Sequence, residues 1–279
     1  LQLAAHRADV RGGEVARLRS DAIDILIDAL FLRAGSAAAT LSLVATGGYG
    51  RAELCPLSDI DLLVLVPRHS AATKALVEAI LYPLWDLGLK VGQSVRTVTE
   101  STNYAKDDLH LHVALLETRH LCGSPELFAQ LEAKTAALLS GQAWKPFARA
   151  IVESQRKRRE KAGGSAYLQE PDLKNGVGAL RDVQGCVWIA RTARNGVGPA
   201  GLAASGFLPA VDLQKFEEAK QVLLRLRCEL HFQVTRPTEQ LSLERQDTMS
   251  SALGFTGTLT QRIGGMMRQY FDAADHVRR

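Results

Sequence analysis

Two short apolar runs near the front of the chain constrain its fold more than any other feature. The first covers residues 41–46 and ends at Gly47 and Gly48, and the second covers residues 60–66 and ends at Pro67. Runs of this length, bounded by residues that break regular structure, are typical of buried β-strands. The sequence therefore predicts a small sheet whose first two strands are joined through a glycine turn.

Helical periodicity surrounds these runs. Apolar residues recur at helical spacing over 13–32, and residues 70–87 have a helical composition that Pro83 is expected to kink or divide. Residues 91–98 alternate as a third strand would. This order of elements predicts an α/β (α+β) fold, with a small mixed sheet and helices on one side.

The rest of the chain, after about Lys106, is mainly helical. Apolar stripes predict helices over 109–121, 126–139, 144–160, 181–194, 213–234 and 257–278. The polar, glycine-rich stretch 161–178 predicts an exposed loop. We expect two domains: residues 1–142, with the sheet and an N-terminal helix, and residues 143–279, mainly helical.

The composition excludes several classes of protein. With 279 residues, 46% hydrophobic and 23% charged, the chain can bury a substantial core. A net charge of +4 permits an anionic partner but is too small to predict a nucleic-acid groove, and the basic run 156–159 is interpreted as a solvated helix face. Charges interrupt every apolar stretch before it could cross a membrane, and a secretory signal pattern is lacking. We expect a cytoplasmic protein.

Four cysteines, Cys55, Cys122, Cys186 and Cys228, lie far apart, without CxxC spacing or a nearby pair of histidines. This spacing favours neither a zinc site nor a disulfide framework. The sequence begins without methionine and ends on Arg279 without a tail, which we interpret as a segment of a longer protein.

Asp59 and Asp61 are the strongest candidates for chemistry. Strand side chains alternate, so both carboxylates are expected on one face, where a magnesium ion would relieve their repulsion. Taken alone, this spacing is also typical of two solvent-facing residues on an edge strand. The upstream Gly47 and Gly48 and the adjacent Ser58 favour a phosphate site, because glycine lets the backbone approach phosphate oxygens closely.

Three blocks carry a family resemblance. The segment GGYGRAELCPLSDIDLLVLV, residues 47–66, resembles the signature of the DNA polymerase β-like nucleotidyltransferase superfamily and, more narrowly, of the bacterial PII-protein uridylyltransferases. The segment YLQEPDLKNGVGALRDVQ, residues 167–184, resembles a second region of that family. The final MMRQYFDAADHVRR is similar to the family's helix before a phosphohydrolase domain. The glutamine synthetase adenylyltransferases share related versions of the first two blocks.

This resemblance implies a metal-dependent nucleotidyltransferase. It implies transfer of a uridylyl group from UTP, with Mg²⁺, to a tyrosine of a PII-like signalling protein in nitrogen regulation. It also implies a longer bifunctional enzyme with a uridylyl-removing HD domain and ACT domains. The alternatives are an adenylyltransferase resembling the glutamine synthetase-modifying enzyme and a nucleotide-binding regulatory module without turnover.

The resemblance also assigns roles to residues. Asp59 and Asp61 become the catalytic metal ligands. Gly47 and Gly48 cradle the triphosphate through their amides, and Ser58 adds a hydroxyl.

Four basic residues complete the expected nucleotide site. Arg51 is either a phosphate clamp or a solvated turn residue. Arg96 contacts phosphate if its face of the third strand meets the site. Lys174 and Arg181 of the helical domain close over the nucleotide, with Asp182 orienting Arg181.

The superfamily usually places a third carboxylate on a later strand, and the strand at 91–98 carries none. The second metal site and the base are therefore left open. Glu100, Asp107 and Glu117 are the candidates for the base.

Overall fold

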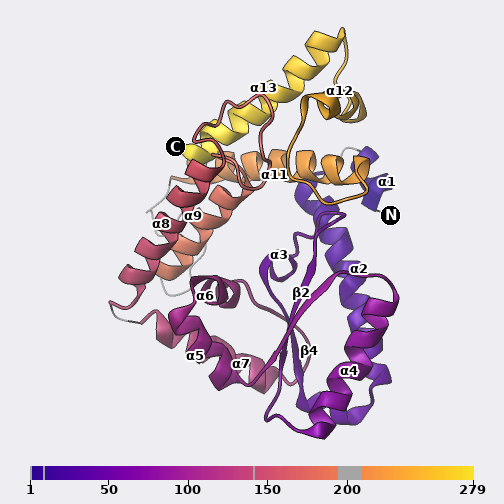
Figure 1. Cartoon of the computed structure of the whole chain (residues 1–279), viewed down its shortest axis with the longest axis vertical. Coiled ribbons are helices and arrows are strands. Elements are labelled where there is room, and N and C mark those ends of the chain that lie inside the picture. The colour runs from indigo at the N-terminus through magenta and orange to yellow at the C-terminus, as the bar shows by residue number, and fades with distance from the viewer. Residues whose placement is uncertain (1, 9, 141, 194–208) are drawn as a thin grey trace. The chain divides into compact units, whose positions relative to one another are not determined.

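The computed structural model describes residues 2–8, 10–140, 142–193 and 209–279, which divide into two compact units (Figure 1). The sheet unit comprises Arg19–Leu54 and Ser58–Trp144, and the helical unit comprises Leu1–Leu18, Cys55–Leu57 and Lys145–Arg279. The units change at residue 144, near the expected domain boundary after residue 142. The chain's first residues and Cys55–Leu57 group with the helical unit, so neither unit is one continuous stretch.

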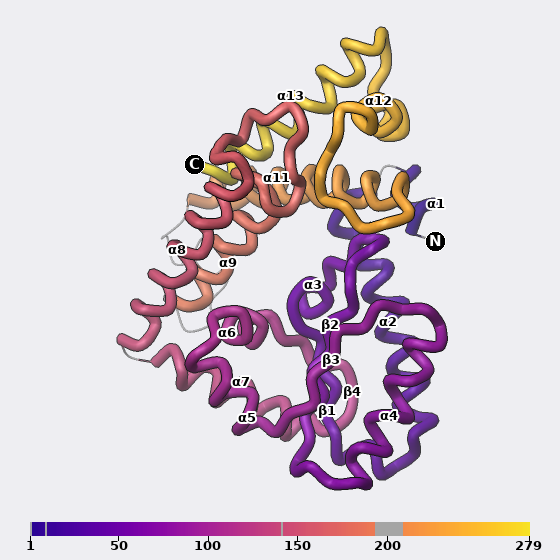
Figure 2. Tube along the Cα trace, in the orientation of Figure 1, coloured from indigo at the N-terminus to yellow at the C-terminus, as the bar shows by residue number. Residues whose placement is uncertain are grey.

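Four strands, labelled in Figure 2, form the sheet of the sheet unit, and their order is β3-β2-β1-β4. They are β1 (Ser42–Ala45), β2 (Ile60–Leu65), β3 (Val91–Arg96) and β4 (Arg119–Gly123). β1 is antiparallel to both β2 and β4, whereas β3 is parallel to β2. The mixed sheet and three of its strands are as predicted from the sequence.

Helices cover both faces of this sheet, so the prediction of helices on one side was wrong (Figure 1). Ile60, Leu62 and Val64 pack with α2 (Gly12–Arg33) and α4 (Ala71–Asp86). Leu63 and Leu65 pack with α5 (Val98–Asp107), α6 (Leu109–Leu116) and α7 (Pro125–Leu138). Both faces of β2 are apolar, and each therefore needs a cover.

Two expected helices differ from the prediction. α4 begins after its capping residue Ser70 and continues through Pro83 without being divided. The helix expected over 109–121 ends at Leu116, and the chain from Arg119 onward pairs with β1 as an edge strand. Its strand partner lies far away in sequence, so local periodicity could not reveal the change.

The helical unit has its core between α11 (Ala210–Gln233) and α13 (Leu259–Arg278). The other helices among its described residues are α1 (Gln2–Arg7), α8 (Trp144–Lys161), α9 (Leu180–Ala193) and α12 (Leu243–Ala252), and the sheet unit adds a short 3₁₀ helix, Ser36–Thr40. The helices expected over 144–160, 213–234 and 257–278 are confirmed with shifted ends. The expected end of the helix over 181–194 lies outside the described residues. None of the described helices has the length and apolarity that a membrane crossing requires.

Candidate functional site

The carboxylate of Asp61 lies between two glycines on neighbouring elements. A Cβ added to Gly47 would lie 3.2 Å from Asp61 Oδ2, and one added to Gly92 would lie 2.8 Å from Asp61 Oδ1. Gly92 is the residue of β3 paired with Asp61 in the parallel register. Asp59 and Asp61 are both exposed, whereas Ile60 between them is fully buried. The alternation expected from the sequence thus places the two carboxylates on the solvent side of the strand start.

The glycine turn is a short helical turn, α3 (Gly47–Gly50), which begins at a residue with φ +56. That left-handed conformation is one that glycine adopts without strain. The turn is tied to the strand start by the Thr46 amide, which donates to the Asp61 carbonyl at 3.0 Å. At its end, a Cβ on Gly50 would lie 1.7 Å from the Glu117 carbonyl oxygen. The backbone therefore needs glycine at both ends of α3.

Tyr49, in the middle of this turn, anchors it to α2. Its side chain is fully buried, and its hydroxyl donates to Asp24 Oδ1 at 2.6 Å. Arg119 of β4 donates to both carboxylate oxygens of Asp24 and to the Tyr49 carbonyl. Burial and the hydrogen bond to Asp24 raise the pKa of Tyr49 well above its ordinary value. This network was not predicted, because its members lie in distant parts of the sequence.

Arg51 fixes the exit of the turn. Its guanidinium lies 2.7 Å from Glu53 and 2.6 Å from Glu117, and only 16% of its side chain is exposed. Arg51 is therefore not a solvated turn residue. Two carboxylates already bind its guanidinium, and its contact with phosphate stays a prediction.

The three candidate bases lie in different surroundings. Glu117 is engaged with Arg51, and Asp107 ends α5 with an exposed side chain. Hydrogen bonds from the Thr97 amide and from His69 lower the pKa of Glu100 to about 2, which makes Glu100 a weak base. Among the described residues, no three acidic, histidine or cysteine side chains gather as a metal-binding group would require.

Ser58 and Arg96 occupy opposite ends of the expected site. The Ser58 carbonyl accepts a hydrogen bond from Arg19 at 2.9 Å, which fixes the backbone just before Asp59. Arg96 pairs with Leu65, four residues beyond Asp61, or roughly 13 Å along the strand. Its guanidinium lies over the ring of Tyr104, 5.1 Å from the centroid. Gly92 is thus the residue of β3 beside Asp61, a role that the sequence did not reveal.

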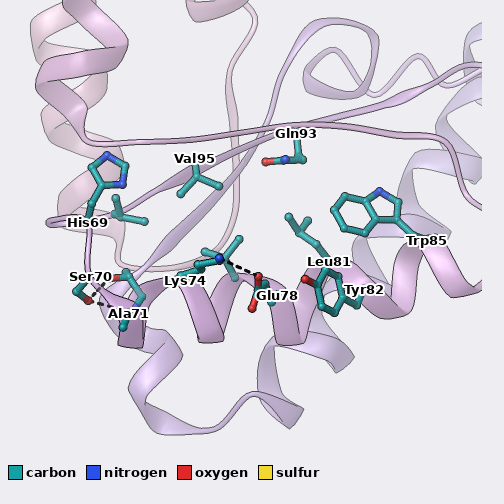
Figure 3. Close-up of a pocket in the computed structure, with 13 residues that line it drawn as sticks. His69, Ser70, Ala71, Lys74, Glu78, Leu81, Tyr82, Trp85, Gln93 and Val95 are labelled. Atoms are coloured by element: carbon teal, nitrogen blue, oxygen red, sulfur yellow. Dashed lines mark hydrogen bonds and ion pairs between the residues drawn. The ribbon is translucent and has the colours of Figure 1, made fainter.

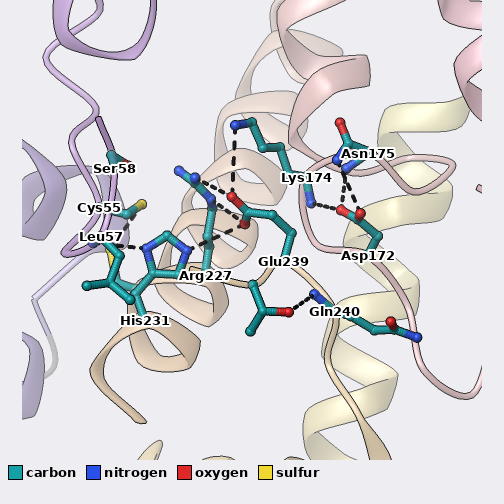
Figure 4. A network of polar contacts seen from close by, with 12 residues as sticks. Cys55, Leu57, Ser58, Asp172, Lys174, Asn175, Arg227, His231, Glu239 and Gln240 are labelled. Carbon is teal, nitrogen blue, oxygen red and sulfur yellow. Dashed lines mark hydrogen bonds and ion pairs between the residues drawn. The ribbon is translucent and has the colours of Figure 1, made fainter. Parts of the chain in front are cut away.

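Lys174 and Arg181 belong to the helical unit. The Lys174 Nζ lies 3.9 Å from Glu239, which also binds Arg227 (Figure 4). The Arg181 amide donates to the Lys174 carbonyl at 2.8 Å, and its guanidinium lies over the Trp188 ring. Their action on a nucleotide together with the aspartates of the sheet unit stays a prediction.

Asp182 holds the start of α9 to α8. Its fully buried carboxylate is bound by Arg158 and Arg159 and accepts a hydrogen bond from the Gly178 amide at 2.7 Å. Half of the basic run 156–159 therefore faces a buried acid, and the interpretation of this run as a solvated face was wrong for these two arginines.

A pocket of about 710 Å³ lies between α4 and β3 (Figure 3). Trp85, Tyr82 and Lys74 of α4 and Gln93 and Val95 of β3 line it. Gln93 and Val95 point to the opposite face of β3 from Gly92, the residue beside Asp61, because side chains alternate along a strand. None of the expected site residues lines the pocket. This pocket is separate from the candidate site.

Comparisons with known proteins match two ranges of the chain. Residues 32–115 match the model described as a nucleotidyltransferase domain, and residues 146–279 match the model described as GlnD PII-uridylyltransferase. These ranges contain the Asp59 and Asp61 strand and the Lys174 loop, respectively.

Curated relatives cover both ranges. The bifunctional uridylyltransferase/uridylyl-removing enzyme of Cereibacter sphaeroides is 37% identical over 239 residues, 85% of this chain and 26% of that protein. The enzyme of the same name from Bradyrhizobium sp. strain ORS 278 is 38% identical over 245 residues, covering 87% and 26%. That of Bordetella avium is 36% identical over 270 residues, covering 96% and 30%. The chain thus spans between about a quarter and a third of these relatives.

The mixed sheet, its glycine turn and the match over residues 32–115 define the class: the chain carries a nucleotidyltransferase domain. The second match and the relatives narrow the assignment. The chain belongs to the PII-uridylyltransferase family.

Proposed function

We propose that this chain transfers a uridylyl group from UTP to a tyrosine hydroxyl of a PII-type signalling protein. The observation that carries the proposal is the Asp61 carboxylate held beside the glycine turn, with Asp59 exposed next to it. The names of the relatives favour UTP over ATP as the donor, and the description of the matching family model favours a PII protein as the acceptor. We propose that the reaction takes place in the cytoplasm and serves nitrogen regulation.

The two aspartates fit a magnesium ion. Mg²⁺ prefers oxygen ligands and is commonly held by one or two carboxylates plus substrate phosphates. Asp59 and Asp61 supply two exposed carboxylates at one end of β2, and Gly47 and Gly92 leave space around the second. When bound, the ion would neutralise charge on the triphosphate and on the transition state. The number of ions is left open, because no third carboxylate joins the pair among the described residues.

Other residues are assigned to the nucleotide. Gly47 and Gly48 present backbone to the phosphates with no side chain in the way, and Ser58 precedes the metal ligands with its backbone fixed by Arg19. Lys174 and Arg181 would contribute positive charge from the helical unit.

We propose that Arg51 and Arg96 affect nucleotide binding only indirectly. Arg51 holds the exit of the glycine turn through Glu53 and Glu117, and Arg96 lies further along the sheet. We expect both to affect nucleotide binding less than Asp61 does, because the contacts given by the structure engage them elsewhere.

Calorimetry separates this proposal from its alternatives. The chain is titrated with UTP, ATP, CTP and GTP, with and without Mg²⁺. We expect UTP to bind most tightly and to require the ion. A preference for ATP would instead support an adenylyltransferase, and binding that ignores Mg²⁺ would support a regulatory module without turnover.

Turnover is tested with labelled UTP and a PII protein. Replacing Asp59 and Asp61 together by Asn is expected to lower tyrosine labelling by about a hundredfold or more, because both proposed ligands lose their charge. Asp86→Asn is the matched control, since it neutralises an exposed aspartate at the end of α4. Equal labelling by the double variant and the control would refute the assignment of the metal ligands.

A further inference from the structure

The helical unit brings together two cysteines that are far apart in sequence. Cys55 and Cys228 are both fully buried, and the Cys228 thiol lies 3.5 Å from the Cys55 sulfur. Both are free cysteines. A disulfide bond has an S–S length near 2 Å, so bonding these sulfurs would require them to approach by roughly 1.5 Å.

The surroundings of this pair are charged. Arg227, next to Cys228 in the chain, is buried and donates to Glu239 at 2.8 and 2.6 Å. His231, one helical turn further, accepts a hydrogen bond from the Leu57 amide at 3.2 Å. Two polar side chains of α11 thus lie near Cys55.

These contacts make the two thiols unequal. The hydrogen bond from Cys228 and the nearby charge of Arg227 lower the pKa of Cys55, although burial opposes the charged form. The pKa of Cys228 is raised by the same hydrogen bond and by burial. These contacts favour loss of the proton from Cys55 rather than from Cys228, and the two sulfurs lie close enough for one to attack a sulfenic acid formed on the other.

We propose that Cys55 and Cys228 form a reversible disulfide when the chain meets hydroperoxides. The Cys55 thiolate attacks one peroxide oxygen, the O–O bond breaks, and the leaving oxygen takes up a proton and departs as water or an alcohol. Cys55 is then a sulfenic acid. The Cys228 sulfur attacks it, the S–O bond breaks, and the hydroxyl leaves as water with the Cys228 proton. Two thiols and one hydrogen peroxide thus give one disulfide and two waters.

A disulfide between Cys55 and Cys228 would restrain the segment that precedes Asp59. Cys55 begins the short segment that leads into the Asp59 strand, and Leu57 in that segment is already held by His231. A disulfide would tie the segment covalently to α11. Because both sulfurs are buried, small hydroperoxides suit this reaction better than bulky disulfides.

The test uses the whole chain and hydrogen peroxide. After treatment, the chain is unfolded in the presence of an alkylating reagent so that all remaining thiols, buried ones included, are blocked, and peptides are mapped by mass spectrometry. We expect a linked peptide containing Cys55 and Cys228, the loss of two hydrogen atoms from the protein, and two of its four thiols still available for alkylation. A dithiol reductant should restore all four.

Single variants and a control sharpen the result. In Cys228→Ser, Cys55 should stop at a sulfenic acid, which a cyclic diketone added together with the denaturant traps, and in Cys55→Ser neither product should form. Cys186→Ser removes an exposed cysteine and should leave the link intact. Oxidation of Cys186 in the parent chain without any Cys55 to Cys228 link would overturn the proposal. This mapping needs no variant to fold and no nucleotide, so it is independent of the proposed function.

Discussion

At the scale of single residues, two glycines decide where the Asp61 carboxylate can lie. Gly47 leaves room on one side of the carboxylate and Gly92 on the other. A Cβ at Gly47 would lie 3.2 Å from one carboxylate oxygen, and a Cβ at Gly92 would lie 2.8 Å from the other. Gly47 lies in the recognisable glycine turn, whereas Gly92 belongs to a strand without any motif. Only the parallel register of β2 and β3 places Gly92 beside Asp61.

Gly92→Ala is therefore expected to impair the site while preserving the fold. The new methyl group would displace the flexible end of Asp61, and we expect Mg²⁺-dependent UTP binding and labelling to fall by about 10- to 100-fold. The free energy of unfolding should change by less than about 1 kcal/mol. Calorimetry and urea unfolding measure the two effects.

Gly264→Ala is the control for that substitution, because a Cβ at this position of α13 meets nothing within 4 Å. We expect unchanged nucleotide binding and a slightly higher stability. If Gly92→Ala also binds UTP normally, the position of the Asp61 carboxylate beside Gly92 is not needed for nucleotide binding.

At the scale of elements, buried ion pairs hold loops against helices. Glu239 follows α11, and it accepts hydrogen bonds from Arg227 and lies 3.6 Å from His231 and 3.9 Å from Lys174 (Figure 4). Burial opposes its ionisation, but the hydrogen bonds from Arg227 and His231 and the charge of Arg227 hold the pKa of Glu239 down to about 2. This network connects the loop that carries Lys174 to α11.

The stability that Glu239 contributes should depend on pH. Its pKa is lower in the folded chain than the ordinary 4.5, so its contribution is complete above pH 4.5 and is lost as the pH falls towards 2. The difference corresponds to roughly 3 kcal/mol. Urea unfolding between pH 5 and 2.5 should show a shallower decline for Glu239→Gln than for the parent chain.

Glu132→Gln, which changes an exposed glutamate of α7, should retain the decline of the parent chain. If the free energy of unfolding falls with pH equally in Glu239→Gln and Glu132→Gln, the ionised Glu239 does not stabilise the folded chain. The sequence could not reveal this network, because its four side chains come from three separate segments. The helices themselves were predicted, since their apolar periodicity is local.

At the scale of the whole molecule, distant parts of the chain pack within one unit. His6 and Arg7 of α1 both lie 2.8 Å from Glu229 of α11, whose side chain is fully buried. The helical unit therefore includes the start of the sequence, although most of it follows residue 144.

Removing this contact should destabilise the helical unit. The double variant His6→Ala and Arg7→Ala leaves the buried Glu229 carboxylate without its two basic neighbours, and we expect it to lower the free energy of unfolding by about 3 kcal/mol. Arg11→Ala, which breaks an exposed pair with Glu14, should have little effect in the same urea titration. Equal effects of the two changes would mean that α1 contributes little to the unit.

The sequence by itself determined the class of fold, the strands of the first two apolar runs, most of the helices and the glycine turn before Asp59 and Asp61. These features follow from local periodicity and from residues adjacent in the chain. Only the tertiary structure decided that helices cover both faces, that residues from Arg119 form an edge strand, and that Gly92 lies beside Asp61. Each of these depends on pairing between segments distant in sequence, and side-chain periodicity carries no information about such partners.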